Sequence, residues 1–152
     1  SLEDVQEQRA EIDAVNDELD ITVLQGIEAD ITDDGLDISR EMVEAVDLVV
    51  ASLHRVPDDP TAAVIAAFED WPVAVWGHPT NRKLLERDPV DLDLDTIMEF
   101  RDANDFVIST DAHRPAALDY LHLGVAQARR GWLEQGDVLT TRPLDDLQDA
   151  LT

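Results

Sequence analysis

Several side chains that could bind a metal follow short apolar runs in this sequence. His54 follows the run 48–53, and His78 follows the run 73–77. The complete set of such residues is Glu28, His54, His78, Asp111 and His113. Imidazole nitrogen and carboxylate oxygen are ligands that suit zinc, manganese or iron. Because a site with two or more such ions can activate water and neutralise a phosphate together, the set predicts metal-dependent phosphate chemistry.

Each of these residues, taken alone, is also compatible with a structural role. A single histidine after a strand more often caps a loop or lies buried in a hydrogen bond than binds a metal. Asp111 is also suited to cap a helix that begins at Pro115. Neither role accounts for three of the four histidines at such positions, or for His113 two residues after Asp111. We therefore favour the metal site and give His122, in the middle of a predicted helix, a structural role.

Basic and aromatic residues near the predicted site are ambiguous. Arg82 follows His78 closely, and its guanidinium could hold phosphate oxygens, but a solvated loop arginine is equally consistent with the sequence. We interpret Arg129 and Arg130 as favourable charge at a helix C-terminus. The three tryptophans are expected to pack in the interior rather than to stack on bases: Trp71, Trp76 and Trp132.

The elements that must position these residues alternate along the chain. Apolar runs predict strands at 21–24, 48–52, 73–76 and 106–110, with a short fifth strand at 138–139. Periodic patterns predict helices at 2–19, from 41 after an N-cap at Ser39, at 61–68, 95–104, 115–130 with a break near Gly124, and 144–151. Continuous apolar strands between helices are typical of a parallel sheet, whose carboxyl strand ends lie on one face. We expect one α/β domain, either doubly wound or part of a barrel.

The charge balance is extreme. The 152 residues include 35 acidic and 11 basic ones, and the formal net charge is -24, with Lys83 as the only lysine. High net charge favours disorder, but the acids alternate with strong apolar runs, so we favour adaptation to molar salt, where the Debye length falls to about 3 Å. Because phosphate contacts contribute less at such salt, the charge neither supports nor excludes a nucleic-acid substrate.

The sequence also limits covalent chemistry and location. It has no cysteine, which excludes disulfides, thiolate zinc sites and a cysteine nucleophile. No apolar run has the length of a membrane span and no signal-peptide pattern opens the chain, so we expect a cytoplasmic protein without a membrane partner. No oligomeric state is predicted. The chain begins with Ser1 rather than Met, which is consistent with a fragment.

An ordered series of short motifs runs through nearly the whole chain. They are GIEADI at 26–31, DGLD at 34–37, ASLH at 51–54, GHPTNR at 77–82, STDAH at 109–113, GV at 124–125 and ARRGW at 128–132. Each is weak alone, but the ordered set is specific. It resembles the C-terminal portion of the PHP (polymerase and histidinol phosphatase) domain, similar to that of family X DNA polymerases, and its composition is haloarchaeal-like.

The resemblance implies a distorted (β/α) barrel of mostly parallel strands with outer helices, which holds up to three divalent ions. It implies Mn²⁺ or Zn²⁺, with Mg²⁺ as an alternative. Glu28 would bridge two ions, and His54 and His78 would complete one site with it. Asp111 would belong to the other bridged site and His113 to a third. The implied activity is phosphate-ester hydrolysis, including 3′-end processing and 3′–5′ exonuclease action on DNA. We expect Glu28 and Arg82 to be the catalytic residues.

The chain also departs from the family pattern. The His-x-His motif of the first strand and the later Asp-His motif are absent, as is a strand-helix unit with a Glu-x-Asn signature expected between Arg82 and Phe106. A full barrel takes about 250 residues, so we expect an incomplete barrel over residues 1–152. Two functions therefore remain open: a metal-dependent phosphoesterase, or a degenerate PHP fragment with a structural or partner-binding role. A doubly wound phosphate-binding domain is disfavoured because no glycine-rich phosphate loop is present.

Overall fold

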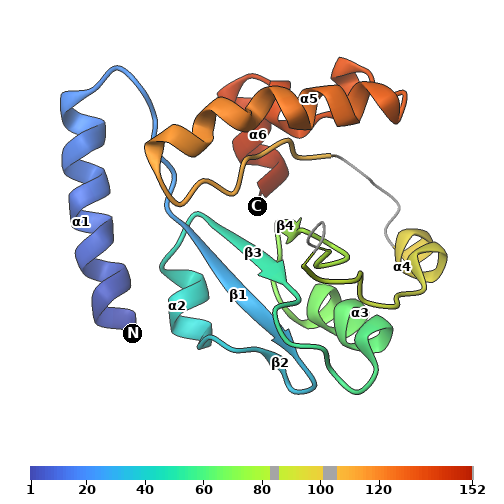
Figure 1. Cartoon of the computed structure of the whole chain (residues 1–152). Helices are drawn as coiled ribbons and strands as arrows, with labels where there is room; N and C mark the ends of the chain where they lie inside the picture. The colour runs from blue at the N-terminus through green and yellow to red at the C-terminus, as the bar shows by residue number, and fades with distance from the viewer. Residues whose placement is uncertain (83–85, 101–105, 152) are drawn as a thin grey trace. The chain divides into compact units, whose positions relative to one another are not determined.

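The computed structural model describes residues 1–82, 86–100 and 106–151. The chain forms two compact units, Ser1–Phe100 with Leu151–Thr152, and Arg101–Ala150 (Figure 1). That residues 1–152 make a single domain stays a prediction. None of the described helices is both long and apolar enough to cross a bilayer.

A four-stranded sheet lies at the centre of the first unit. Its order is β2-β1-β3-β4, and the strands are β1 (Gly26–Thr32), β2 (Gly35–Leu36), β3 (Leu48–Ser52) and β4 (Val75–Gly77). Strand β3 pairs in parallel with β1 and β4, whereas the hairpin strand β2 pairs antiparallel with β1. The prediction of a mostly parallel α/β fold is confirmed. The sheet formed by the described residues is open, so they do not form a closed barrel.

In the described part of the first unit, four helices accompany this sheet: α1 (Leu2–Glu18), α2 (Arg40–Glu44), α3 (Pro60–Asp70) and α4 (Leu94–Phe100). Side-chain caps explain where three of them begin. Ser1, Ser39 and Asp59 each accept a hydrogen bond from a backbone N–H of the first turn that would otherwise lack a partner. The predicted helix at 95–104 ends its described part at Phe100, and the remainder lies outside the described residues.

The core lies on one face of the sheet. Because side chains alternate along a strand, Ala29 and Ile31 of β1 share this face, and the parallel register places Ala51 of β3 beside Ala29. These side chains are buried together with Val64 and Ala67 of α3. The opposite face of β1 carries Glu28 and Asp30. Strand β1 therefore has an apolar face for packing and a polar face for chemistry.

The first predicted strand, at 21–24, is wrong. Strand β1 begins at Gly26 instead, because the side chain of Asn16 forms hydrogen bonds with both the N–H and the C=O of Val23. Asn16 Nδ2 donates to Val23 O at 3.0 Å, and Val23 N donates to Asn16 Oδ1 at 2.7 Å. Val23 thus pairs with a helix side chain rather than with a neighbouring strand. Glu28 consequently lies inside a strand and not after its end.

A carboxylate at the amino end of β3 ties α1 to the sheet. Asp47 accepts hydrogen bonds from Gln25 N at 2.6 Å and from Arg9 Nη1 of α1 at 3.0 Å. Burial by itself raises the pKa of Asp47. The Arg9 guanidinium and the Gln25 N–H together lower this pKa by more than burial raises it, so the net shift is downward. Gln25 is buried and donates to Val5 O of α1 at 2.8 Å, which completes the attachment.

The hairpin between β1 and β2 depends on Gly35. Its φ is +111°, a conformation that side chains disfavour, and a Cβ there would lie 2.8 Å from Trp71 Nε1. We expect Gly35→Ala to lower the free energy of unfolding by about 1–3 kcal/mol in urea titrations at molar KCl. Gly136→Ala is the control, because a Cβ at Gly136 meets no atom within 4 Å. Equal stability of the two variants would contradict this assignment.

The second unit consists of short helical segments. They are η1 (Pro115–Tyr120), α5 (Leu121–Arg130), η2 (Gln135–Asp137), η3 (Leu139–Thr141) and α6 (Leu144–Leu151). The helix at 144–151 is confirmed. The predicted break near Gly124 is wrong, because the change from 3₁₀ to α-helix occurs between Tyr120 and Leu121. Gly124 instead lets Ile108 approach α5, since a Cβ there would lie 2.7 Å from Ile108 Cγ2.

The predicted strands at 106–110 and 138–139 are also wrong. Among the described residues, these segments share one parallel bridge, between Phe106 and Val138. Phe106 N donates to Asp137 O and Leu139 N donates to Phe106 O, both at 2.8 Å. Beyond this pair the ladder stops, and Ile108 N donates to the side chain of Thr140. The apolar run at 106–110 therefore makes one bridge but does not form a strand among the described residues.

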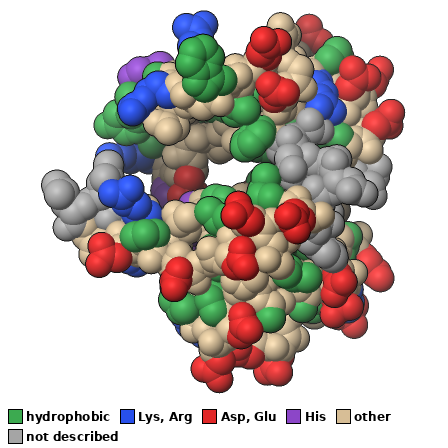
Figure 2. All heavy atoms as spheres, turned by 90° about the vertical axis from the view of Figure 1, so that its right-hand side faces the viewer, with side chains coloured by type: hydrophobic (Ala, Val, Ile, Leu, Met, Phe, Trp, Pro, Cys, Tyr) green, Lys and Arg blue, Asp and Glu red, His purple; other side chains and the backbone are tan. Residues whose placement is uncertain are grey.

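Among the charged side chains on the displayed surface, carboxylates predominate (Figure 2). Figure 2 shows Asp and Glu side chains spread over the face it displays, interspersed with apolar patches and few basic groups. Helix α1 alone carries exposed acids at Glu7, Glu11 and Glu18. This distribution fits a folded, highly acidic protein rather than a disordered one.

Candidate metal centre

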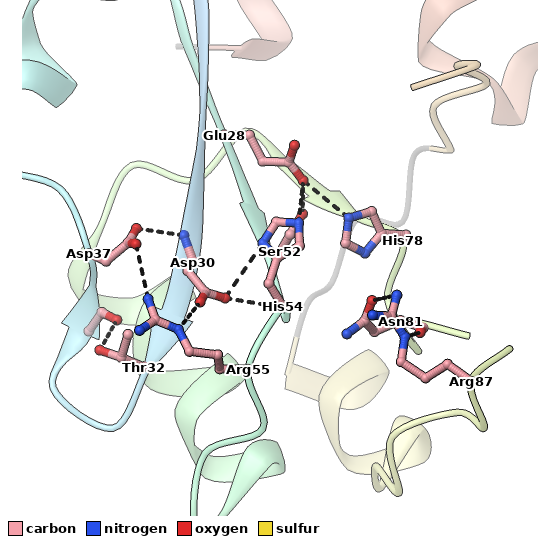
Figure 3. Close-up of polar contacts among 11 residues, drawn as sticks. Glu28, Asp30, Thr32, Asp37, Ser52, His54, Arg55, His78, Asn81 and Arg87 are labelled. Atoms are coloured by element: carbon pink, nitrogen blue, oxygen red, sulfur yellow. Dashed lines mark hydrogen bonds and ion pairs between the residues drawn. The ribbon is translucent and has the colours of Figure 1, made fainter. Parts of the chain in front are cut away.

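Glu28, His54 and His78 lie together at one edge of the sheet. One potential ligand atom from each lies within 4.8 Å of those of the other two. Glu28 Oε1 is 3.2 Å from His78 Nε2 and 3.6 Å from His54 Nε2. The two imidazole rings meet edge to face, with centroids 5.0 Å apart. Figure 3 shows the Glu28 carboxylate directed at both rings.

The parallel register explains this convergence. Ser52 pairs with Gly77, so β3 and β4 end level with each other, and His54 and His78 follow at the same edge. Glu28 pairs with Val50, two residues before the end of β3. The long side chain of Glu28 therefore has to reach forward toward the histidines.

Two small residues make room for the carboxylate and hold it. Ser52 is fully buried, and its Oγ donates to Glu28 Oε1 at 2.5 Å. A Cβ at Gly77 would overlap Ser52 Oγ and lie 3.4 Å from Glu28 Oε1, so only glycine leaves this space open. Both residues belong to the motifs at 51–54 and 77–82, yet the motifs alone predict no role for them. Their role depends on strand register, which the sequence does not display.

The backbone at His78 has an unusual conformation. Its φ is 27°, in the left-handed region where non-glycine residues are uncommon and where histidine is enriched. A turn holds it there, because Asn81 N donates to His78 O at 2.7 Å. Asn81 is buried with φ 48°, and Arg87 donates to both its backbone and side-chain oxygens. The motif at 77–82 thus builds a fixed turn that presents one imidazole.

The three candidate ligands remain accessible. Their side chains are 34% exposed for Glu28, 49% for His54 and 34% for His78. Next to them, Asp30 is buried and accepts hydrogen bonds from Arg55 Nε and His54 N, both at 2.8 Å. Burial by itself raises the pKa of Asp30. Arg55 and the backbone N–H groups together lower this pKa by more than burial raises it, so the net shift is downward. Asp30 is therefore a carboxylate behind an open site.

The remaining predicted site residues have different surroundings. Asp111 and His113 belong to the second unit, where Asp111 Oδ1 lies 3.5 Å from His113 Nε2 and both side chains are exposed. The first helical segment there takes Arg114 as its N-cap, so Asp111 does not cap it. Arg82 is exposed and forms no hydrogen bond or ion pair with any residue that the structure describes. That these three residues serve the site stays a prediction.

The residues assigned to structural roles also differ. His122 Nδ1, in α5, lies 2.7 Å from Asp119 O of the preceding segment η1, which fits a structural role. Trp71 and Trp76 pack against the core of the first unit, as predicted. The packing predicted for Trp132 is wrong for the described residues, because Trp132 is 92% exposed. Its own backbone has a φ of 62°, in the left-handed region.

No protein-family model matches the chain. It is similar to "DNA polymerase/3'-5' exonuclease PolX" of Bacillus subtilis (strain 168), with 31% identity over 182 aligned residues. The similarity supports a PHP-like relationship. It covers 97% of this chain but 32% of the relative, so the chain spans about a third of that protein's length.

The alignment also reveals a difference in length. The aligned region, 182 residues, is longer than the 152 residues of this chain. The relative must therefore carry residues within that region that have no counterpart in this chain.

Proposed function

We propose that the chain is a PHP-type metal-dependent phosphoesterase module that acts on phosphate esters, and on DNA 3′ ends as part of a family X DNA polymerase. One observation carries the proposal: the ligand atoms of Glu28, His54 and His78 lie within 4.8 Å of one another at a partly exposed sheet edge. The similarity to a protein named as a polymerase and 3′-5′ exonuclease supports the choice of substrate. In this proposal, the open sheet is part of an incomplete PHP-type barrel.

The three residues fit a divalent cation. One carboxylate oxygen and two imidazole nitrogens form a donor set that suits Zn²⁺ or Mn²⁺, with Mg²⁺ the harder alternative. A cation held there would supply Lewis-acid activation of water and positive charge opposite a phosphate group. That positive charge matters in this chain, because a net charge of -24 otherwise repels an anionic substrate.

Other residues of the chain are proposed to position Glu28, to add metal ligands and to contact the substrate. Ser52 fixes Glu28 Oε1 beside the two imidazoles, which leaves Glu28 Oε2 available for a second ion. Asp111 and His113 are the proposed further ligands. Arg82 is the proposed contact to substrate oxygens, since a guanidinium can hold two of them at once. The partial exposure of the three ligands gives a phosphate ester direct access to the site.

A non-catalytic role is the second candidate. In the described residues, a single group of three side chains could hold an ion, whereas phosphoesterases with two ions need a larger ligand set. In that case the chain would be a degenerate PHP fragment that binds one ion, or none, and serves as a structural or partner-binding module.

Nuclease assays separate the two candidates. We expect the chain in molar KCl with Mn²⁺ or Zn²⁺ to release nucleotides stepwise from the 3′ end of a 5′-labelled single-stranded oligonucleotide. Chelation should stop the release, and added metal should restore it. Glu28→Gln protein purified identically controls for contaminating nucleases. Protein that binds metal but hydrolyses neither DNA nor a small phosphate monoester would favour the non-catalytic role.

A further inference from the structure

Two acidic residues of the motifs, Asp30 and Asp37, have no part in the proposed ligand set. Both lie beside the candidate metal centre, and Arg55 joins them (Figure 3). Asp30 is 6% exposed, and it is the one charged side chain among the buried residues that the structure describes. A carboxylate in that position needs an explanation, because burial of an acid is costly unless it is fully paired.

Asp30 lies directly behind His54. Its Oδ1 accepts the backbone N–H of His54 at 2.8 Å and is 3.6 Å from His54 Nδ1. The other ring nitrogen, Nε2, lies 3.6 Å from Glu28 Oε1. The imidazole therefore lies between two carboxylates, one at each nitrogen. Because Glu28 and Asp30 are two residues apart on β1, the pleat of the strand places both on the same face.

The β1–β2 hairpin fixes Asp30 from the other side. Asp30 N donates to Asp37 Oδ1 at 2.7 Å, and Asp37 N donates to Asp30 O at 3.1 Å. Arg55 Nε donates to Asp30 Oδ2 at 2.8 Å, and Arg55 Nη2 lies 3.5 Å from Asp37 Oδ2. With Oδ2 held by Arg55, Oδ1 is left to face His54.

This arrangement has a chemical consequence for His54. A neutral imidazole carries one proton, and the two carboxylates compete for it at the same distance of 3.6 Å. Glu28 Oε1 already accepts a hydrogen bond from Ser52 Oγ and lies 3.2 Å from His78 Nε2, whereas Asp30 is buried, so the tautomer with the proton on Nδ1 is favoured. The lone pair then lies on Nε2, which faces Glu28. Histidines that bind metals usually direct their second N–H at a carboxylate or carbonyl in this way, and loss of such a partner lowers metal affinity about 10- to 100-fold.

We infer that Asp30 is a positioning residue for His54, which selects the Nδ1–H tautomer and directs Nε2 into the metal centre. Asp37 and Arg55 hold Asp30 in place for this task. The inference rests on the proposed function for its purpose, but the tautomer itself is a property of the metal-free chain. It assigns a role to the motifs at 26–31 and 34–37 beyond Glu28.

The test is ¹⁵N NMR of the histidine rings in the full-length, metal-free protein in molar KCl at about pH 9, where imidazoles are neutral. We expect wild-type His54 to carry its proton on Nδ1. In Asp30→Asn, one of the two acceptor oxygens becomes an NH₂ group that must face either Arg55 or the ring. The Nδ1–H fraction should therefore fall, and the affinity for Mn²⁺ measured by calorimetry should fall about 10- to 100-fold.

Asp47→Asn is the matched control. Asp47 also accepts from one arginine and one backbone N–H, but it precedes β3, roughly 16 Å along the strand from Ser52. A comparable loss of stability is expected there, with no change in the His54 tautomer or in metal affinity. If Asp30→Asn fails to fold, Arg55→Lys tests the same network from a side chain that is 75% exposed, and should shift the tautomer less but in the same direction.

Distinct outcomes separate this inference from the proposed function. An Nε2–H tautomer in the wild-type protein, or an unchanged tautomer and affinity in both Asp30→Asn and Arg55→Lys, would overturn the inference. Wild-type protein that binds no Mn²⁺ or Zn²⁺ would overturn the proposed function, while the tautomer measurement would still decide the role of Asp30.

Discussion

Glu28→Gln is expected to lower the affinity of the chain for Mn²⁺ or Zn²⁺ on the order of 100-fold or more, and to remove metal-dependent hydrolysis. The reason is that contacts converge on one atom. Glu28 Oε1 accepts a hydrogen bond from Ser52 Oγ and lies 3.2 Å from His78 Nε2 and 3.6 Å from His54 Nε2. Glutamine keeps the shape of the side chain but loses its charge, so the fold should remain intact.

Titration calorimetry of chelator-treated protein in molar KCl provides the measurement for this variant. Glu44→Gln is the control, because Glu44 lies in α2 with an exposed side chain. Circular dichroism of both variants should match that of the wild type. Metal binding by Glu28→Gln at the strength of the wild type would exclude Glu28 from the site.

The second large effect concerns salt. We expect the free energy of unfolding to rise on the order of 3 kcal/mol or more between about 0.1 M and about 2 M KCl, because salt screens the repulsion among carboxylates. The net charge of -24 sets the sign of this effect. Below about 0.1 M, the chain should be largely unfolded or expanded.

Urea unfolding at a series of KCl concentrations measures this dependence. A variant that combines Glu7→Gln, Glu11→Gln and Glu18→Gln removes three exposed charges from α1. It should need less salt for the same stability. A stability that does not depend on KCl, or a variant with the same salt dependence as the wild type, would contradict the salt-adaptation hypothesis.

The sequence predicts best where local chemistry decides the structure. The strand at 48–52 is continuous and apolar, and it forms with the predicted bounds. Ser39 caps its helix as expected, because a serine before a helix satisfies a first-turn N–H. His54 and His78 could be placed at one sheet edge from the sequence because each follows a predicted parallel strand.

The sequence predicts least where distant residues decide. The run at 21–24 has the composition of a strand, but Asn16 pairs with Val23 from seven residues away. Ser52 and Gly77 support Glu28 only because the register of β3 with its neighbours puts them beside it. The role of Asp30 likewise depends on Arg55 and on a hairpin that no local pattern specifies in detail.

The most direct test of the metal centre is anomalous diffraction from crystals grown in molar salt with Mn²⁺ or Zn²⁺. We predict an anomalous peak in contact with Glu28, His54 and His78, with metal–ligand distances of about 2.0–2.2 Å. If crystals grown with the metal in the mother liquor show no anomalous peak at these three side chains, the proposed metal centre is contradicted.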